Sequence, residues 1–467
     1  MTAAPPAFPV APRYPSALAM IGNTPLVEVR RLDTGPCRLF LKLENQNPGG
    51  AIKDRVGRPM IEAAEADGRL KPGGPNIEAT AGNTGLGLAL VAAQKGYRLV
   101  IVVPDKMAQE KLFHLRALGA EIYLTRSDVG KGHPAYYQDM AERLARENGW
   151  FYVNQFGNPA NPRAHLETTG PELWAQMQGR VDAVVCGVGS GGTITGLSRF
   201  FAGVSPATEM VLADPKGSIL AHYVATHEVS TDVGSWTVEG IGEDFIPEIA
   251  DLSRTRLAYT IDDKEALNTA RELLRLEGIL GGSSTGTLLA AALRYCREQT
   301  TEKHVVTFVC DSGNKYLSKQ FNDFWMLEQG FIERPRRGDL GDLVSRRHED
   351  RATVTLQAED TLLIAQARMR LYDISQLPVL DAAGTVVGIL AEEDLLFRVM
   401  EAPARFKDPV ASAMSTRLDT IQARQPLADL KPIFAKGHVA IVLDGDQFLG
   451  LITRMDLLTH LRRKATT

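Results

Sequence analysis

The larger, N-terminal part of the chain is built around the stretch Gly49-Gly50-Ala51-Ile52-Lys53-Asp54-Arg55. Two glycines permit a tight turn before a predicted helix, and Asp54 places negative charge in the first helical turn, where the helix dipole favours it. A lysine at this position can point into a cleft and react with an aldehyde cofactor. Taken alone, Lys53 is more simply a solvated lysine at a helix end, so neighbouring motifs must decide.

The composition narrows the possible classes of protein. The chain has 467 residues, beyond the ~250–300 at which single cores tend to split into domains. Its formal net charge of -4 provides no basic field for nucleic acid. Four cysteines without a CxxC pair argue against a disulfide scaffold or a metal site and fit a reducing cytoplasm. No apolar run approaches the ~20 residues that span a bilayer, and the Pro- and Ala-rich start predicts an arm rather than a secretory signal.

Short apolar runs alternate with helical stretches between Leu39 and Phe308, which predicts parallel sheets covered by helices on both faces. The predicted strands are residues 38–43, 76–79, 99–103, 121–124, 181–186, 210–213 and 305–310. The predicted helices include residues 53–66, 85–95 and 109–118.

The pattern changes after Gly330. Residues 333–339 are charged and rich in turn formers, which predicts a linker. Beyond the linker lie two copies of one pattern, about sixty residues apart. In the first, Pro378 to Asp381 leads to Gly388 to Leu396, and in the second, Ile441 to Asp444 leads to Gly450 to Leu458. Each copy predicts two strands followed by a helix. Two such units side by side could bury a core that neither buries alone.

The motif Thr80-Ala81-Gly82-Asn83-Thr84-Gly85 lies between a predicted strand and a predicted helix. Open α/β sheets bind ligands at the carboxyl ends of their strands, and a helix N-terminus attracts anions. A substrate carboxylate would suit this position, although an ordinary strand-to-helix turn explains the motif equally well.

The motif Gly187-Val188-Gly189-Ser190-Gly191-Gly192-Thr193 also joins a strand to a helix and is suited to cradling phosphate. It satisfies G-x-G-x-x-G as well, and Asp214 follows at about the spacing of a ribose-binding acid. This stretch alone therefore leaves open a dinucleotide-binding fold, and with it an NAD-dependent oxidoreductase.

The motif Gly281-Gly282-Ser283-Ser284-Thr285-Gly286 formally matches G-x-S-x-G. The match to a hydrolase is weak, because no strong strand leads into it and only His304 follows before the linker. A serine hydroxyl that hydrogen-bonds a heteroaromatic nitrogen is a better role. Ser283 could also simply cap the following helix.

Together with residues 21–26 and 240–247, these motifs occur in the order seen in the β-family of pyridoxal phosphate enzymes, which the chain resembles from Ser16 to about Phe331. That family includes cysteine synthase and cystathionine β-synthase. The resemblance implies a two-lobed α/β fold similar to the tryptophan synthase β-subunit, with parallel and mixed sheets and flanking helices. The C-terminal repeat resembles a tandem pair of CBS domains. The expected organisation is an arm over residues 1–15, a catalytic domain over 16–332, a linker over 333–345 and CBS domains over 346–467, divided at about 346–402 and 408–465.

The resemblance also implies pyridoxal 5'-phosphate as the cofactor and assigns roles to the matching residues. Lys53 would bind the cofactor and move the substrate Cα proton, Asn83 would contact the ring hydroxyl, and Ser283 would face the pyridine nitrogen. A hydroxyl there does not enforce a protonated ring, which favours β-elimination. The expected phosphate-binding residues are Gly189, Ser190, Gly191, Gly192 and Thr193. The expected substrate-binding residues are Thr80, Ala81, Asn83, Thr84, Gln155, Gly242 and Glu243.

The implied reaction condenses L-serine with L-homocysteine to L-cystathionine and water. Phe156 and Glu243 stand where the animal cystathionine β-synthases have tyrosine, and Ala81 stands where many relatives have serine. The acceptor could therefore instead be sulfide, with serine or O-acetylserine as donor, as in a cysteine synthase. The partners expected are these small molecules and further copies of the chain, without nucleic acid or membrane.

The CBS-like repeat suggests regulation. CBS domains that bind nucleotides often carry Gly-x-x-Thr/Ser-x-x-Asp, which Gly450, Thr453 and Asp456 match. In the first copy Asp394 matches, but Ala391 lacks the hydroxyl. If an adenosyl ligand such as S-adenosylmethionine binds, the CBS domain that contains Asp456 is the better candidate for its site. Alternatively, the two CBS domains could have a purely structural role in assembly. Because the N-terminus lacks the cysteine–histidine haem segment of the animal enzymes, no haem is expected.

Overall fold

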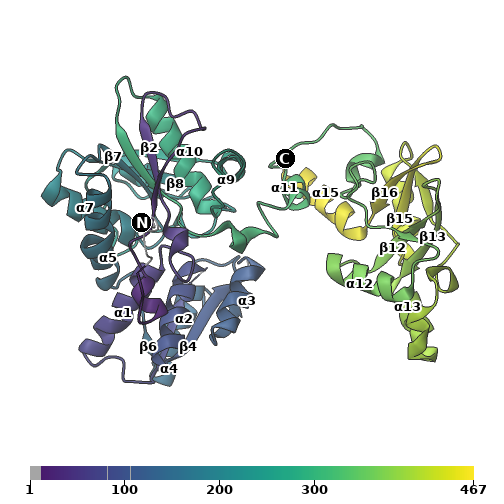
Figure 1. The fold of residues 1–467 in the computed structure, drawn as a ribbon, viewed down its shortest axis with the longest axis horizontal. Coiled ribbons are helices and arrows are strands. Elements are labelled where there is room, and N and C mark those ends of the chain that lie inside the picture. The colour runs from purple at the N-terminus through teal and green to yellow at the C-terminus, as the bar shows by residue number, and fades with distance from the viewer. Residues whose placement is uncertain (1–11, 81, 106, 467) are drawn as a thin grey trace, which may run out of the picture. The chain divides into compact units, whose positions relative to one another are not determined.

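The computed structural model describes residues 12–80, 82–105 and 107–466. It divides into two compact units, the first ending at Met326 and the second beginning at Leu327 (Figure 1). Among the described residues, no helix is both long and apolar enough to cross a membrane.

The first unit contains a six-stranded sheet in the order β1-β2-β10-β7-β8-β9, in which only β1 runs antiparallel to its neighbour. Its central strands are apolar on both faces, because helices cover both sides. The strands are β1 (Leu26–Glu28), β2 (Arg38–Lys42), β10 (His304–Phe308), β7 (Ala183–Gly187), β8 (Glu209–Pro215) and β9 (Thr255–Ile261).

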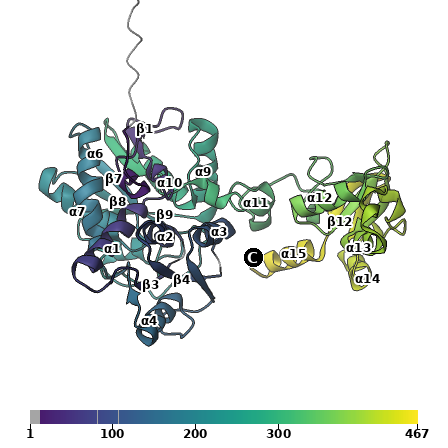
Figure 2. The same ribbon diagram turned by 60° about the horizontal axis from the view of Figure 1, so that its bottom comes forward.

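A second sheet of the first unit has four parallel strands in the order β5-β4-β3-β6. In β4, Leu99, Ile101 and Val103 enter one apolar core, while Val100 and Val102 enter a second core on the opposite face, beneath α4 (Figure 2). This alternation follows from the two-residue period of a strand. The strands are β3 (Pro75–Ala79), β4 (Arg98–Pro104), β5 (Glu121–Thr125) and β6 (Phe151–Tyr152).

Helices flank both sheets. They are α1 (Asp54–Ala66), α2 (Asn83–Lys95), α3 (Gln109–Ala117), α4 (Tyr137–Asn148), α5 (Ala160–Ala164), α6 (Gly170–Gln176), α7 (Gly192–Val204), α8 (Leu220–Thr226), α9 (Asp263–Glu277) and α10 (Ser283–Arg297). A further helix, α11 (Asp323–Gln329), spans the boundary between the two units. The predicted α/β class is confirmed. The predicted helix 85–95 begins two residues earlier, at Asn83, directly after Gly82, whose non-helical backbone (φ 159°, ψ −100°) is one that glycine adopts readily.

Two glycines bring α1 and α2 into direct backbone contact. A Cβ on Gly57 would lie 2.8 Å from the carbonyl carbon of Gly87, and a Cβ on Gly87 would lie 2.6 Å from the Lys53 oxygen. Side chains at these positions would force the helices apart. The contact therefore sets the separation between the turn of Lys53 and the helix that begins with Asn83.

The second unit contains two three-stranded sheets with the same pairing pattern. In each, the first two strands are parallel, the last two are antiparallel, and a register shift interrupts the antiparallel pair at an equivalent place. Leu380, Ile441 and Phe448 form a core cluster shared by the two halves, as the repeat predicts. The strands are β11 (Leu356–Gln357), β12 (Gln376–Leu380), β13 (Val386–Ala391), β14 (Thr420–Gln422), β15 (Ala440–Asp444) and β16 (Gln447–Ile452), and the helices are α12 (Leu362–Tyr372), α13 (Glu392–Glu401), α14 (Leu430–Ala435) and α15 (Arg454–Thr466).

Candidate active site

A cavity of about 540 Å³ lies in the first unit, with walls from both of its sheets. It brings together most of the residues singled out from the sequence. Those that line it are Lys53, Thr80, Asn83, Thr84, Gln155, Gly189, Ser190, Thr193, Gly242 and Glu243. Gly191, Gly192 and Ser283 do not line it, and Ala81 lies outside the described residues.

Lys53 immediately precedes α1 and points its amine into this cavity. Burial lowers the pKa of Lys53, and the nearby Cys310 and Glu243 act in the opposite direction. A lowered pKa increases the fraction of neutral amine at neutral pH, the form that can attack an aldehyde or accept a proton. The turn is anchored by Ile52, whose N–H donates to the Cys310 oxygen at 2.8 Å.

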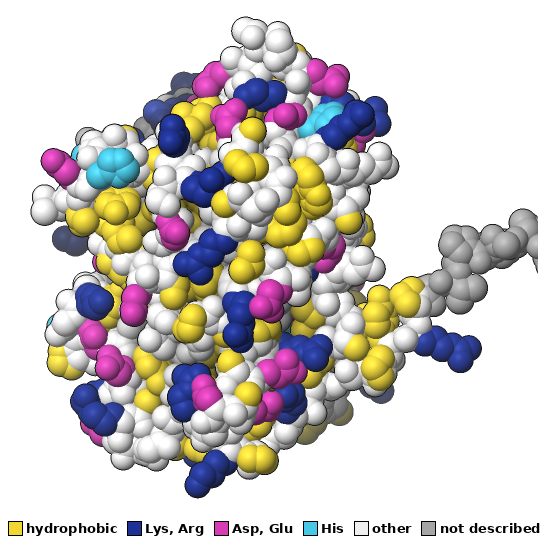
Figure 3. Space-filling model, turned by 90° about the vertical axis from the view of Figure 1, so that its left-hand side faces the viewer, with side chains coloured by type: hydrophobic (Ala, Val, Ile, Leu, Met, Phe, Trp, Pro, Cys, Tyr) yellow, Lys and Arg dark blue, Asp and Glu magenta, His cyan; other side chains and the backbone are white. Residues whose placement is uncertain are grey.

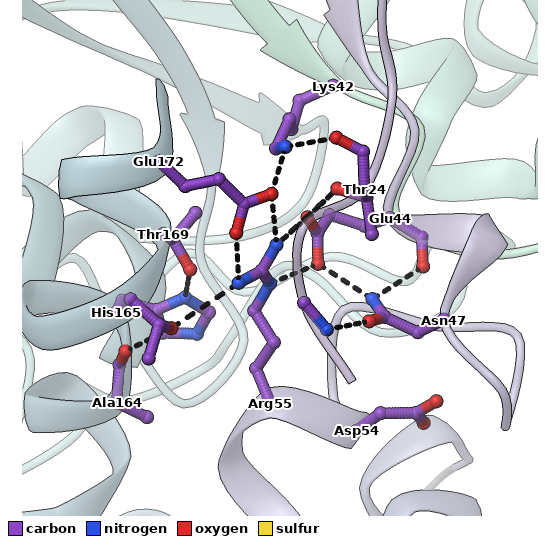
Figure 4. A network of polar contacts seen from close by, with 12 residues as sticks. Thr24, Lys42, Glu44, Asn47, Asp54, Arg55, Ala164, His165, Thr169 and Glu172 are labelled. Atoms are coloured by element: carbon purple, nitrogen blue, oxygen red, sulfur yellow. Dashed lines mark hydrogen bonds and ion pairs between the residues drawn. The ribbon is translucent and has the colours of Figure 1, made fainter. Parts of the chain in front are cut away.

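A buried ion cluster lies behind the Lys53 turn (Figure 4). The guanidinium of Arg55 makes paired contacts of 2.7 and 2.8 Å with Glu44 and of 2.9 and 3.1 Å with Glu172. Lys42 donates to Glu172 as well and to the Thr24 oxygen at 2.5 Å. Burial acts to raise the pKa of Glu44, but the Arg55 charge and hydrogen bonds hold it below its usual value. The cluster joins β2 and α6 to the start of α1.

Gln155 connects the end of β3 to the first turn of α2. The Thr84 hydroxyl donates to Gln155 Oε1 at 2.6 Å, and Gln155 Nε2 donates to the Ala79 oxygen at 3.1 Å. Gly82 N–H donates to Thr80 Oγ1 at 3.1 Å. The first turn of α2 therefore faces the cavity from a rigid base, and its unpaired N–H groups suit a carboxylate.

The glycine-rich loop before α7 fits a phosphate group. Gly191 has a φ of 85°, and a Cβ there would lie 2.5 Å from the Ala250 Cβ. A Cβ on Gly192 would lie 1.9 Å from Asn161 Oδ1. Asn161 Nδ2 donates to Ser190 Oγ at 2.9 Å. The backbone is thus pressed close to its neighbours at the start of α7, where N–H groups and the helix dipole attract anions.

The Ser283–Ser284 pair divides its roles. Ser283 Oγ accepts a hydrogen bond from the Glu239 N–H at 3.0 Å, and Ser283 is buried and is not among the described residues that line the cavity. Its role opposite the pyridine nitrogen stays a prediction. Ser284 and Cys310 line the cavity instead. Burial raises the pKa of Cys310 to about 12, so it presents a neutral thiol.

Several cavity neighbours were not found from the sequence. They are Lys111, Asn161, His165, Glu239, Asp311 and Lys315. Asp311 directly follows the predicted strand 305–310, and its place at the carboxyl end of a parallel strand is a usable signal. Lys111 and Lys315 give no such signal, because lysine is usually exposed.

Asp214, the residue that would bind ribose in a dinucleotide fold, is turned inward. It is 0% exposed, and its Oδ2 accepts from the Ala221 N–H at 2.8 Å. The dinucleotide interpretation of Gly187 to Gly192 therefore has no ribose-binding acid at this position.

In the second unit, Thr453 and Asp456 form a cap at the start of α15. Asp456 Oδ2 accepts from Thr453 N at 2.7 Å and from Thr453 Oγ1 at 2.6 Å, and Ser345 donates to the other oxygen. In the first copy, Asp394 accepts only from Ala391 N, at 3.2 Å, among the described contacts. The two halves therefore differ in the hydroxyl groups that surround the acid.

Comparison with known families gives two matches. Residues 18–311 match the family described as pyridoxal-phosphate dependent enzyme, and residues 344–401 and 410–463 each match the CBS domain.

Similar proteins span nearly the whole chain. Cystathionine beta-synthase of Dictyostelium discoideum is 36% identical over 459 residues, covering 95% of this chain and 91% of that protein. Cystathionine beta-synthase of Saccharomyces cerevisiae is 33% identical, covering 96% of this chain and 97% of that protein. Cysteine synthase A of Escherichia coli is 41% identical over 303 residues, which are 64% of this chain and 92% of that protein.

Two solved structures resemble the first unit in fold. A hydrogen sulfide-producing enzyme from Fusobacterium nucleatum aligns with a TM-score of 0.60 and 36% identity, covering 65% of this chain and all of the other. O-ureido-L-serine synthase aligns with a TM-score of 0.62 and 33% identity, covering 70% of this chain and 98% of the other.

Proposed function

The chain belongs to the family of pyridoxal-phosphate dependent enzymes and carries out β-replacement with that cofactor, and we propose that it joins L-serine to L-homocysteine to give L-cystathionine and water. The observation that carries this choice is the extent of similarity. The matches to the two cystathionine beta-synthases cover 95% and 96% of the chain and so take in the CBS pair, whereas the match to cysteine synthase A covers 64% of it.

The bound cofactor would supply an electron sink next to the substrate Cα. We assign its phosphate to the loop Gly189, Ser190, Gly191, Gly192 and Thr193, and its attachment to Lys53. Burial lowers the pKa of the Lys53 amine, which suits it first to bind the aldehyde and then to take the Cα proton. Lys53 lines the cavity, so the protonated amine could then donate its proton to the serine hydroxyl, which would leave as water.

The amino-acid carboxylate would bind at the N-terminus of α2. Thr80, Thr84 and Gln155 line the cavity beside this helix end, and Thr84 and Gln155 hold each other in place. A carboxylate here gains from the helix dipole and from N–H groups that lack intrahelical partners. Ala81 would belong to the same loop.

The cavity also carries charged groups that suit an amino-acid thiol. Glu243 and Arg126 both line it, and they offer a carboxylate for an ammonium group and a guanidinium for a carboxylate. Arg126 already donates to Asp128 through Nε and Nη2, so a substrate carboxylate would share or replace that contact. The backbone of Glu243 is fixed, since its N–H donates to Ser218 Oγ at 3.1 Å and its oxygen accepts from Ile219 N–H at 3.1 Å. Sulfide would use neither charged group, which supports homocysteine as the acceptor.

A cysteine synthase is the second candidate. Phe156 lines the cavity where the cysteine synthase version of this motif also has phenylalanine, and the first unit is 41% identical to cysteine synthase A. Such an enzyme would join sulfide to serine or to O-acetylserine.

Product identification separates the two candidates. Purified protein supplied with serine and homocysteine should form cystathionine at a higher kcat/KM than it forms cysteine from sulfide with serine or O-acetylserine. The Lys53→Ala variant should form neither product. Efficient cysteine formation without cystathionine would reject the proposed acceptor.

We also propose that the second unit binds an adenosyl ligand, with Thr453 and Asp456 in the main site and Asp394 in a weaker one. The hydroxyl groups of Thr453 and Ser345 around Asp456 support this order. Titration calorimetry with S-adenosylmethionine should show binding that Asp456→Asn weakens more than Asp394→Asn does. Equal affinity in both variants and in the unmodified protein would reject this site.

A further inference from the structure

The side-chain amide of Asn83 lies between two charged groups of opposite hydrogen-bonding character. Lys315 Nζ donates to Asn83 Oδ1 at 3.0 Å, and Asn83 Nδ2 donates to Asp311 Oδ2 at 2.8 Å. An ammonium group has only donors, and a carboxylate has only acceptors. Each neighbour therefore favours one orientation of the amide, and the two preferences add, so removing either one weakens the restraint. Turning the amide over would set N–H against ammonium and oxygen against carboxylate.

Lys315 also connects this amide to the turn that carries Lys53. Its other hydrogen bonds go to the backbone oxygens of Gly49 at 3.2 Å and Gly50 at 3.0 Å. The three donors of the ammonium group are thus distributed over the Lys53 turn and the start of α2. Lys315 is 6% exposed, so water does not compete for these contacts.

Asp311 is equally restrained. It is 0% exposed, and its Oδ2 also accepts from the Tyr316 hydroxyl at 2.8 Å. Gly282 leaves the room that this carboxylate occupies, because a Cβ there would lie 1.9 Å from Asp311 Oδ1. The loop before α10 therefore accommodates the Asp311 carboxylate, and the Tyr316 hydroxyl holds its Oδ2.

We propose that Lys315 and Asp311 are positioning residues that lock the Asn83 amide so that its second N–H serves as a donor to the cofactor ring oxygen. The inference rests on the cofactor-binding role proposed for Asn83, which lines the cavity beside Lys53. A donor stabilises the deprotonated, anionic form of that oxygen. An unrestrained amide could equally present its own oxygen, which would favour the protonated form.

The test uses the absorbance of the holoenzyme. The ratio of its two cofactor bands reports whether the ring oxygen carries a proton, and no thiol substrate is needed. Lys315→Met should shift this ratio toward the protonated form by roughly tenfold, the effect of one hydrogen bond to a charged group. Lys315→Arg should restore most of the ratio, because a guanidinium is also a donor without acceptors.

Lys42→Met is the matched control. Lys42 is another buried lysine with three hydrogen-bond partners, but none of those partners lines the cavity, whereas Asn83, a partner of Lys315, does. Lys42→Met should lower the melting temperature as Lys315→Met does while leaving the band ratio unchanged. An unchanged ratio in Lys315→Met, or an equal shift in Lys42→Met, would overturn the inference.

A second variant keeps the test open if Lys315→Met does not fold. Asp311→Asn removes one of the two constraints, since an amide neighbour can both donate and accept, and it should give a smaller shift in the same direction. No shift in that variant would also overturn the inference. A protein that shows these spectral responses yet forms no cystathionine would refute the proposed reaction and leave the positioning roles standing.

Discussion

Two buried charge clusters flank the Lys53 turn, and they differ in what they leave unpaired. Behind the turn, Arg55 is satisfied by Glu44 and Glu172, and none of the three is among the described residues that line the cavity. In front of it, Lys315 and Asp311 satisfy only part of the Asn83 amide, which does line the cavity. The first cluster closes on itself, whereas the second retains a donor for a ligand. Similar ionic chemistry thus supports structure on one side of the turn and orientation of a functional group on the other.

The largest effect is expected from removing Lys53, the residue that both clusters flank. Lys53→Ala should lower turnover by on the order of 10³-fold, because it removes the residue to which we assign both the cofactor attachment and the proton transfer. The visible absorbance of the holoenzyme should disappear with it. Lys303→Met, which alters a lysine remote from the cavity, should retain both. A Lys53→Ala protein with normal turnover would refute the assignment.

Breaking the rear cluster should affect stability more than chemistry. Arg55→Met leaves Glu44 buried without its cation, which should cost about 3–5 kcal/mol of unfolding free energy. Urea unfolding monitored by circular dichroism measures this loss. At a temperature where the variant remains folded, its cofactor band ratio should match that of the unmodified protein. A changed band ratio in the folded Arg55→Met protein would mean that this cluster also orients the cofactor.

The buried carboxyl group of Glu78 should affect stability with the opposite pH dependence to that of Glu44. Burial raises the pKa of Glu78 from 4.5 to about 8, although the N–H groups of Gln155 and Ala79 act to lower it. Since the unfolded chain releases this proton first, Glu78 lowers the unfolding free energy as pH rises from about 4.5 to about 8. Glu44 has the opposite sign, because its pKa is held low: its stabilisation is present above the unfolded pKa and is lost as pH falls through the folded one.

The Glu78→Gln variant tests that sign. Between pH 5 and pH 9, the unfolding free energy of this variant should fall less than that of the unmodified protein. The size of the difference follows from the shift of the Glu78 pKa, since each pKa unit corresponds to ~1.4 kcal/mol. Denaturant titrations at both pH values give the slopes. Identical slopes in the two proteins would show that Glu78 ionises normally in the folded state.

The smallest expected effect concerns the acceptor wall of the cavity. Glu243→Gln removes the carboxylate assigned to the ammonium of homocysteine, and the KM for homocysteine should rise by roughly fivefold, the effect of about 1 kcal/mol. The KM for sulfide should not change. Glu248→Gln, an exposed acid on the same segment that does not line the cavity, is the control. Equal changes for both thiols would exclude Glu243 from acceptor recognition.

Much of the fold could be predicted because it follows from local patterns. Continuous apolar runs such as Leu99 to Val103 became buried parallel strands, and the two Gly-x-x-x-x-x-Asp segments became equivalent hairpins with their helices. β9 (Thr255–Ile261) was not predicted, because as an edge strand it alternates buried residues with exposed ones such as Arg256. Its pattern lacks the continuous apolar run that marked the central strands.

The parts of the candidate site in which glycine and hydroxyl residues follow strands could be predicted. The parts that depend on contacts between residues far apart in the sequence could not. Asn83 could be proposed from its loop, but its partners Lys315 and Asp311 come from more than two hundred residues away. Ser283 and Ser284 are adjacent, and only the packing of the Glu239 loop decides which of them faces the cavity. On the face of the first unit shown in Figure 3, acidic and basic side chains are interspersed, so this face has no extended basic patch for nucleic acid. The formal net charge of -4 led to the same expectation.

The contact between Gly57 and Gly87 has a consequence for protein engineering. Because backbone touches backbone there, the separation of α1 and α2 at this crossing is set by the backbone and not by the size of a side chain. In a library of variants, surrounding core residues such as Val56 and Met60 should therefore be replaced only by apolar residues of similar volume. The two glycines are the positions that such a library should hold constant, since a single methyl group at either one would separate the two helices.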